Sequence, residues 1–174
     1  MIETNYDYSS GYHEGSIVVQ DALAFLGVYK RVEDVSERYR FENFRDDVDA
    51  EEMWEAFDAA ELEGISYTTR KYKYEKAWRE WRDYCVEHGV HPAFADPQDI
   101  ENHISEQVEV VPSLETVHTA RFRPLYLWYR WMQWHPDYDH RYNPCVMAVL
   151  LEGAVYDVWA LRLGERKNVP ENHE

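Results

Sequence analysis

Cysteine is scarce in this chain, with 2 residues in 174, and glycine and proline number only 7 each. Cys85 and Cys145 have no pairing pattern and lie in apolar sequence, so we expect two buried thiols in a reducing compartment. The glycines form no phosphate-binding loop and surround no nucleophile. These absences argue against a disulfide scaffold, a P-loop nucleotide enzyme and a serine hydrolase.

Long apolar runs are also missing. No stretch approaches the ~18 residues of a membrane-spanning helix, and the polar N-terminus does not resemble a signal peptide. We therefore expect a soluble, cytoplasmic protein with no membrane partner. Alternating strand patterns and solenoid repeats are absent. The 8 histidines show no zinc-ligand spacing, so we expect no metal and no other cofactor.

Acidic charge is what the chain has in excess. Asp and Glu total 34 against 18 Lys and Arg, which gives a formal net charge of −16. Such a balance argues against a nucleic-acid partner. However, acidic residues occur in every segment, as in the proteins of halophilic archaea whatever their function. The acidic run Glu33–Glu55 is interpreted as a solvated face, or alternatively as a docking surface for a basic partner.

Helical periodicity predicts an all-α fold, a bundle of four to five helices with an N-terminal helical extension. The extension is expected to cover residues 1–48, with one helix over 17–29 and another beginning near Glu33. Residues 49–152 form the expected central domain. A C-terminal helix and a polar tail are predicted for 153–174.

Local signals mark where the helices of the central domain begin. Asp49-Ala-Glu-Glu52 resembles a capping box, and Asp96-Pro97 places a cap before a proline in the first turn. Ser66 is expected to cap a helix from about Tyr67 to His88, which Gly89 ends. Ser113 is expected to cap another, through about Trp134.

The spacing of residues within these two long helices predicts which side chains are buried and where a helix is interrupted. Tyr74, Trp78, Trp81 and Cys85 project onto one narrow stripe at 100° per residue, which favours a packed core over bases stacked on exposed rings. Pro124 lies inside the second helix. It removes a hydrogen-bond donor, so we expect it to kink or split that helix.

The two helices together resemble the N-terminal core-binding domain of tyrosine recombinases, the SAM-like domain of phage integrases. In that family the second and fourth helices open with a small polar residue before Thr, followed by an aromatic and apolar residues at helical spacing. Ser66-Tyr-Thr-Thr69 and Ser113-Leu-Glu-Thr116 match these openings, and Asn143-Pro144 matches the exit toward the catalytic domain. The resemblance covers about residues 49–150. It implies a SAM-like bundle whose second and fourth helices enter the major groove of DNA and contact its backbone.

The resemblance does not include the family's catalytic residues. Those lie beyond the exit and comprise an Arg, a Lys, a His-x-x-Arg box, a further His or Trp and a Tyr nucleophile. His118-Thr-Ala-Arg121 matches the box only as a string, because it lies in the wrong domain. We therefore expect no strand transfer or cleavage, and no enzyme activity, from this chain.

Basic residues gather where the first long helix begins. Between Arg70 and Arg82 six cations stand against two carboxylates, a local net charge of +4. A helix N-terminus adds partial positive charge and free N–H groups, which favour phosphate. The residues predicted to contact DNA are Thr69, Arg70, Lys71, Lys73, Lys76, Arg121 and Arg123.

Two functions are consistent with this pattern. The first is a module that binds double-stranded DNA and acts in, or regulates, site-specific recombination or integration. The alternative is an acidic interaction module that binds a recombinase, another DNA-bound partner or another copy of the chain. The placement of the basic residues distinguishes them: one patch favours DNA, whereas dispersal among carboxylates through pairs such as Lys76–Glu80 favours the interaction module.

Overall fold

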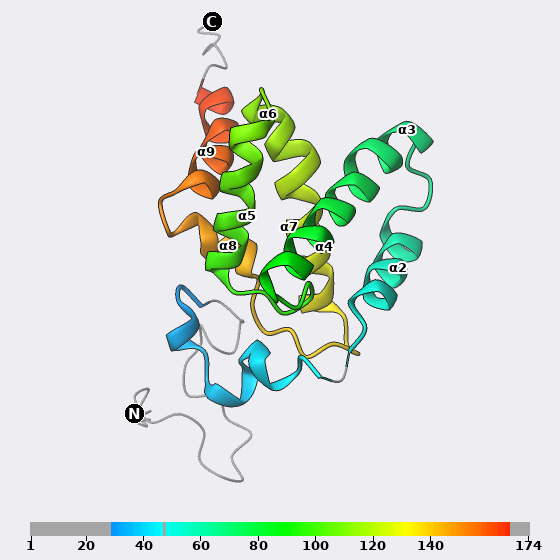
Figure 1. Ribbon diagram of the computed structural model, residues 1–174, viewed down its shortest axis with the longest axis vertical. Coiled ribbons are helices and arrows are strands. Elements are labelled where there is room, and N and C mark those ends of the chain that lie inside the picture. The colour runs from blue at the N-terminus through cyan, green and yellow to red at the C-terminus, as the bar shows by residue number, and fades with distance from the viewer. Residues whose placement is uncertain (1–28, 47, 168–174) are drawn as a thin grey trace, which may run out of the picture.

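The computed structural model describes residues 29–46 and 48–167, and over these ranges it is helical without strands (Figure 1). The expected all-α fold is confirmed. The helix expected over 17–29 lies almost wholly outside the described residues. The principal α-helices are α2 (Ala50–Glu61), α4 (Lys76–His88), α5 (Pro97–Val110), α7 (Arg123–Trp134), α8 (Pro144–Val149) and α9 (Ala154–Lys167).

Both long helices are composite. The first joins α3 (Tyr67–Thr69), a π-helical segment η4 (Arg70–Glu75) and α4, and it ends at Gly89 with φ of 67°. The second joins α6 (Leu114–Val117), a π-helical segment η5 (His118–Phe122) and α7. The expected limits of both helices are therefore confirmed. The left-handed conformation at Gly89 explains why glycine ends the first one.

The π segment in the second helix explains how that helix contains Pro124. Proline cannot donate to the carbonyl four residues earlier, which belongs to Ala120. The backbone N–H of Arg123 bonds to the His118 oxygen in the wider π pattern. The Ala120 oxygen accepts a hydrogen bond from Nη1 of Arg121 at 2.9 Å. The helix thus passes through Pro124 with a change of helical register, and Arg121 supplies a donor for the carbonyl that proline leaves without its usual partner.

The expected helix starts at Asp49 and Asp96 are also confirmed. Asp49 Oδ1 accepts from the Glu51 backbone N–H at 2.8 Å. Asp96 and Asp99 form a reciprocal capping box, in which the Asp96 N–H donates to Asp99 Oδ2 at 2.9 Å. Each cap satisfies N–H groups that have no partner within the helix.

The helix expected after Glu33 is wrong. The chain instead makes three 3₁₀ turns, η1 (Val32–Asp34), η2 (Glu37–Tyr39) and η3 (Phe41–Asn43). Extended residues between the turns prevent a continuous helix. Tertiary packing decides the path, because Val35 and Phe41 are each 1% exposed within the core of the bundle. This segment therefore shares the core of the central domain.

The core is dense in aromatic rings contributed by α2 and both long helices. Trp54 and Trp78 stack with their centroids 5.0 Å apart, and Trp128 meets both edge-on at 5.4 and 5.1 Å. Trp81 is 0% exposed. The stripe expected along the first helix is thus core, as predicted. Both cysteines are buried free thiols, and burial raises their pKa.

The C-terminal helix is hydrogen-bonded to α5 through one carboxylate. Glu101 accepts hydrogen bonds from the backbone N–H groups of Ala154 and Val155, at 2.5 and 3.0 Å, and so caps α9 from another helix. Val155 and Val158 are buried in the common core. Within the described ranges, no helix combines the length and the apolar character needed to cross a bilayer.

Candidate nucleic-acid interface

The two composite helices begin with the same hydrogen-bond arrangement. Ser66 Oγ accepts from the Thr69 N–H at 3.3 Å, and Ser113 Oγ accepts from the Thr116 N–H at 3.3 Å. Ser66 also donates to the Thr69 hydroxyl at 3.0 Å. This contact fixes Thr69, one of the predicted site residues, at the start of its helix. Figure 1 shows α3 and α6 at the same end of the molecule.

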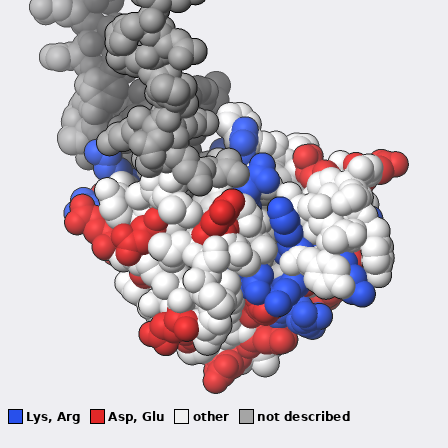
Figure 2. All heavy atoms as spheres, turned by 90° about the horizontal axis from the view of Figure 1, so that it is seen from above, with Lys and Arg blue, Asp and Glu red and all other residues white. Residues whose placement is uncertain are grey.

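Basic side chains form a band on that end of the molecule. In Figure 2, which looks onto it, Lys and Arg run together across the surface, with Asp and Glu to either side. Each composite helix carries exposed cations: Lys71, Lys73 and Arg79 on the first, and Arg123 and Arg130 on the second. A continuous positive band on a protein of net charge −16 is a local reversal of sign. Such a band is the usual electrostatic footprint of phosphate binding.

Two exposed tyrosines accompany the cations at the start of the first helix. Tyr67 is 72% exposed and Tyr72 is 59% exposed. The Lys71 ammonium lies 5.6 Å from the centroid of the Tyr67 ring and 5.7 Å from that of Tyr72. The rings and the cation thus form one polar and aromatic surface, of the kind that can contact sugar, phosphate and base together.

Other predicted residues are already engaged with carboxylates. Arg70 pairs with Asp58 of α2 through a direct hydrogen bond, and it is only partly exposed. Lys76 Nζ lies 3.9 Å from Glu80 Oε1. These two cations are less available to phosphate than Lys71, Lys73 and Arg123. The predicted cations are therefore divided between exposed side chains and side chains that are held in ion pairs.

Arg121 departs furthest from the expected site. It is 4% exposed, and its Nε forms an ion pair with Glu80 and a 3.1 Å hydrogen bond with Gln107 Oε1. Together with the bond to Ala120, these contacts hold the guanidinium between η5, α4 and α5. The expectation that Arg121 reaches the surface is incorrect. Pro124 cannot donate to the buried Ala120 carbonyl, and Arg121 turns inward to supply a donor there.

Four exposed residues of the two composite helices were not among the predicted contacts: Tyr67, Tyr72, Arg79 and Arg130. Arg130 lies seven residues after Arg123, which places both on one face of α7. Tyr67 and Tyr72 lie outside the apolar stripe that begins at Tyr74. Helical spacing could have identified all of them as surface neighbours of the predicted cations.

Two deeply buried histidines belong to the core. His103 is 1% exposed against the rings of Trp81 and Tyr84, and burial lowers its pKa to about 3. His140 bonds to the Ala93 oxygen at 2.6 Å, and burial lowers its pKa to about 4. Among the described residues, no cluster of three or more His, Cys, Asp and Glu side chains is suited to hold a metal ion.

Comparison with protein-family models, curated proteins and solved structures found no match for this chain.

Proposed function

We propose that this protein binds double-stranded DNA through the band on which α3 and α6 begin. Lys71, Lys73 and Arg123 contact phosphates, and the capped helix starts place N–H groups and Thr69 toward the backbone. The observation that carries the proposal is the band itself: exposed cations converge from two helices on a protein whose net charge is −16.

The pattern of helix openings connects this binding to DNA recombination. Ser66 and Ser113 open helices that resemble those with which recombinase core-binding domains grip their sites. We propose that the chain occupies or helps to recognise a recombination or integration site, and that it performs no strand transfer. Incubation with supercoiled plasmid that carries such a site should yield no covalent adduct. Recovery of a phosphotyrosine-linked adduct would contradict this.

A second candidate is an interaction module that binds a recombinase or another copy of the chain. The specific observation in its favour is that Arg70 and Arg121 are tied to Asp58 and Glu80 and do not join the exposed band. An acidic surface with its own cations neutralised suits a basic protein partner.

Salt-dependent DNA binding separates the two candidates. The wild type, a Lys71→Gln/Lys73→Gln/Arg123→Gln variant and a Lys30→Gln/Arg31→Gln control would be titrated against duplex DNA by fluorescence anisotropy. The lowest salt used is the one that preserves the helical circular-dichroism signal, because an acidic protein needs screening to stay folded.

We expect the triple variant to remain folded and to lose most of its duplex affinity. Its slope of log K against log salt should fall by roughly 2–3, because each neutralised phosphate contributes about 0.9. The control should behave like the wild type, since Arg31 pairs with Asp34 away from the band. Equal affinity of wild type and triple variant would reject the DNA function and favour the interaction module.

A further inference from the structure

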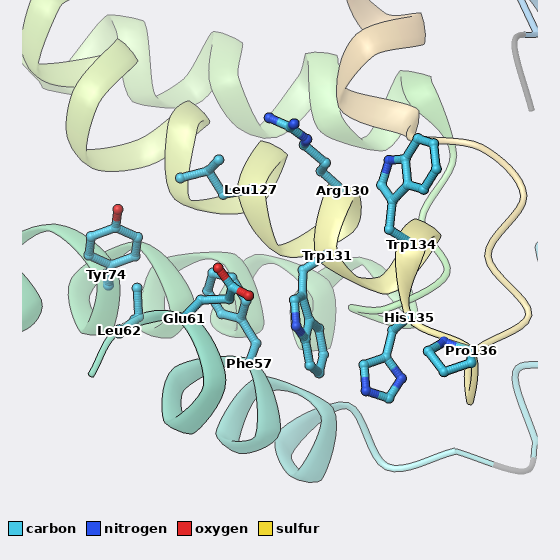
Figure 3. Close-up of a pocket in the computed structure, with 10 residues that line it drawn as sticks. All are labelled: Phe57, Glu61, Leu62, Tyr74, Leu127, Arg130, Trp131, Trp134, His135 and Pro136. Carbon is cyan, nitrogen blue, oxygen red and sulfur yellow. The ribbon is translucent and has the colours of Figure 1, made fainter. Parts of the chain in front are cut away.

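A pocket of about 520 Å³ lies between α2, η4 and α7 (Figure 3). Phe57 and Glu61 line it from α2, Tyr74 lines it from η4, and Leu127 and Trp131 line it from α7. These walls are apolar or aromatic except at Glu61, which is the one carboxylate of the lining. Apolar walls with a single well-placed charge are typical of pockets that bind a ligand of one defined chemistry.

Two aromatic rings meet at one corner of the pocket. The rings of Phe57 and Trp131 meet edge to face, with their centroids 5.8 Å apart and their planes at 61°. Figure 3 shows Trp131 with Phe57 and Glu61 on one side and His135 on the other. Phe57 is 1% exposed whereas Trp131 is half-buried, so Trp131 is the ring of this pair that a ligand can reach. Leu127 lies one turn before Trp131 and extends the same face of α7.

Glu61 brings an exposed negative charge to this corner. It lies one turn after Phe57, so both side chains leave α2 on the same face. Figure 3 shows its carboxylate directed into the space between α2 and α7, with Arg130 and Trp134 on the opposite side of α7. Within the described part of the chain, Glu61 forms no ion pair. An unpaired carboxylate beside the accessible ring of Trp131 favours a cationic ligand.

The helix that carries Glu61 is acidic along its length. α2 contains four Glu and one Asp, and it has no Lys or Arg. Two of these carboxylates pair with arginines of the first composite helix, and the other three, Glu52, Glu55 and Glu61, are exposed. The helix therefore attracts a positively charged segment and repels nucleic acid and acidic protein.

We propose that the pocket receives an arginine side chain from a basic segment of a partner protein. The guanidinium stacks on the face of Trp131 beside Glu61 and donates two hydrogen bonds to the Glu61 carboxylate. The aliphatic stem of the arginine packs against Leu127. The inference does not depend on DNA binding. It goes beyond that function and gives the interaction-module candidate a partner of defined chemistry.

The charges disfavour other occupants of the pocket. A carboxylate or a phosphate would meet Glu61 and the acidic α2 with the same sign of charge. An apolar side chain would remove water from Glu61 without replacing its hydrogen bonds. A lysine would supply the positive charge, but its ammonium lacks the planar fork that can stack on Trp131 and bind both carboxylate oxygens at once.

The test uses fluorescein-labelled peptides in the absence of DNA. The first peptide has one arginine between two lysines, the second has lysine in place of the arginine, and the third has citrulline, which lacks the charge. Anisotropy at constant salt would measure their binding to the full chain and to Glu61→Gln and Glu63→Gln. Glu63→Gln is the matched control, because Glu63 is exposed two residues later and does not line the pocket.

Glu61→Gln should weaken binding of the arginine peptide about tenfold, as expected for the loss of a hydrogen-bonded charge pair. Glu63→Gln should weaken it less than about twofold, because it removes only a surface charge outside the pocket. The wild type should prefer the arginine peptide to the lysine peptide, and the citrulline peptide should bind weakest. The Lys71→Gln/Lys73→Gln/Arg123→Gln variant should bind the arginine peptide at least as tightly as the wild type, which separates this site from the proposed DNA contacts.

Equal effects of Glu61→Gln and Glu63→Gln would overturn the proposal, because the attraction would then be general and not located in the pocket. Equal affinity of the wild type for the arginine and lysine peptides would also overturn it. Free arginine, added as a competitor, should displace the peptide poorly, because its own carboxylate would lie near α2. If free arginine competes as well as the unlabelled peptide does, the pocket binds a small molecule and the partner proposal is wrong.

Discussion

The two composite helices are alike in their beginnings and unlike in the segments after their first turns. Each is capped by a serine that accepts from the N–H three residues on, and each contains a π segment after its first turn. In the first helix that segment exposes Lys71 and Lys73. In the second it buries His118 and Arg121. The same local framework thus presents charge to solvent in one helix and encloses it in the other.

Proline explains the difference. The first helix has no proline, and its π segment leaves Lys71 and Lys73 exposed while Arg70 pairs with Asp58 of α2. The second has Pro124, and the Ala120 carbonyl accepts from Arg121 instead. The number of basic residues in a sequence segment therefore does not give the charge of its surface. A helix that contains proline can require one of its own cations in the interior.

The largest effect should come from the core that the two helices share. Trp78→Ala should destabilise the protein by about 3–5 kcal/mol, because it removes a ring stacked on Trp54 and leaves a cavity. Trp134→Ala is the matched control. Its ring is mostly exposed, so its cost should stay within about 0.5 kcal/mol. Denaturant titration would measure both. A cost below about 1 kcal/mol for Trp78→Ala would show that the stripe is not a packed core.

The next largest effect on stability should come from replacing Arg121, the buried cation of the second helix. Arg121→Met should lower the free energy of unfolding by about 3 kcal/mol, because it removes the buried cation that pairs with Glu80 and the donor to the Ala120 carbonyl. Lys73→Met, at an exposed position of the first helix, should cost less than about 0.5 kcal/mol. Adding Glu80→Leu to Arg121→Met should recover part of the loss. Equal costs for Arg121→Met and Lys73→Met would contradict the contrast between the helices.

Much of the fold could be predicted from sequence because local signals and tertiary packing agree there. Ser66, Ser113, Asp49, Asp96 and Gly89 mark helix ends that the structure confirms. The segment after Glu33 shows the limit. Its charge suggested a helix, but Val35 and Phe41 must both reach the core, and Phe41 packs on Tyr142 from a distant part of the chain.

Less of the candidate site could be predicted, because side-chain direction depends on neighbours that are distant in sequence. Lys71, Lys73 and Arg123 were found from their position in the helices. Asp58 lies on α2, and its pairing with Arg70 depends on how α2 packs. The pocket beside α7 could not be foreseen, since Phe57 and Trp131 come to line it only through the packing of α2 on α7.

Lowering the pH should produce a smaller loss of stability through His103, which packs against the first helix. His103 stays neutral when folded because burial lowers its pKa to about 3 from 6.5. Its contribution is complete above pH 6.5 and decreases as pH falls toward 3, because only the unfolded chain gains the proton. At pH 5 the loss should be about 2 kcal/mol, at about 1.4 kcal/mol per pH unit.

His103→Phe provides the measurement of this effect. The variant should lose about 2 kcal/mol less than the wild type between pH 7 and pH 5 in urea titrations at constant salt. His140, whose pKa is about 4, should supply a similar decline in both proteins. If the wild type and His103→Phe lose the same free energy of unfolding between pH 7 and pH 5, His103 titrates normally in the folded state.

The smallest effect should appear in the salt dependence of DNA binding by single-residue variants of the two helices. Lys73→Gln in the first helix and Arg123→Gln in the second should each lower the salt slope of duplex binding by roughly one unit or less, because each removes one phosphate contact. Arg121→Gln should leave that slope unchanged in whatever fraction remains folded, since its guanidinium is enclosed between Glu80 and Gln107. Circular dichroism would establish that fraction before each titration. If Arg121→Gln lowers the slope as much as Lys73→Gln does, the buried cation reaches DNA after all. The second helix would then present its charge as the first one does.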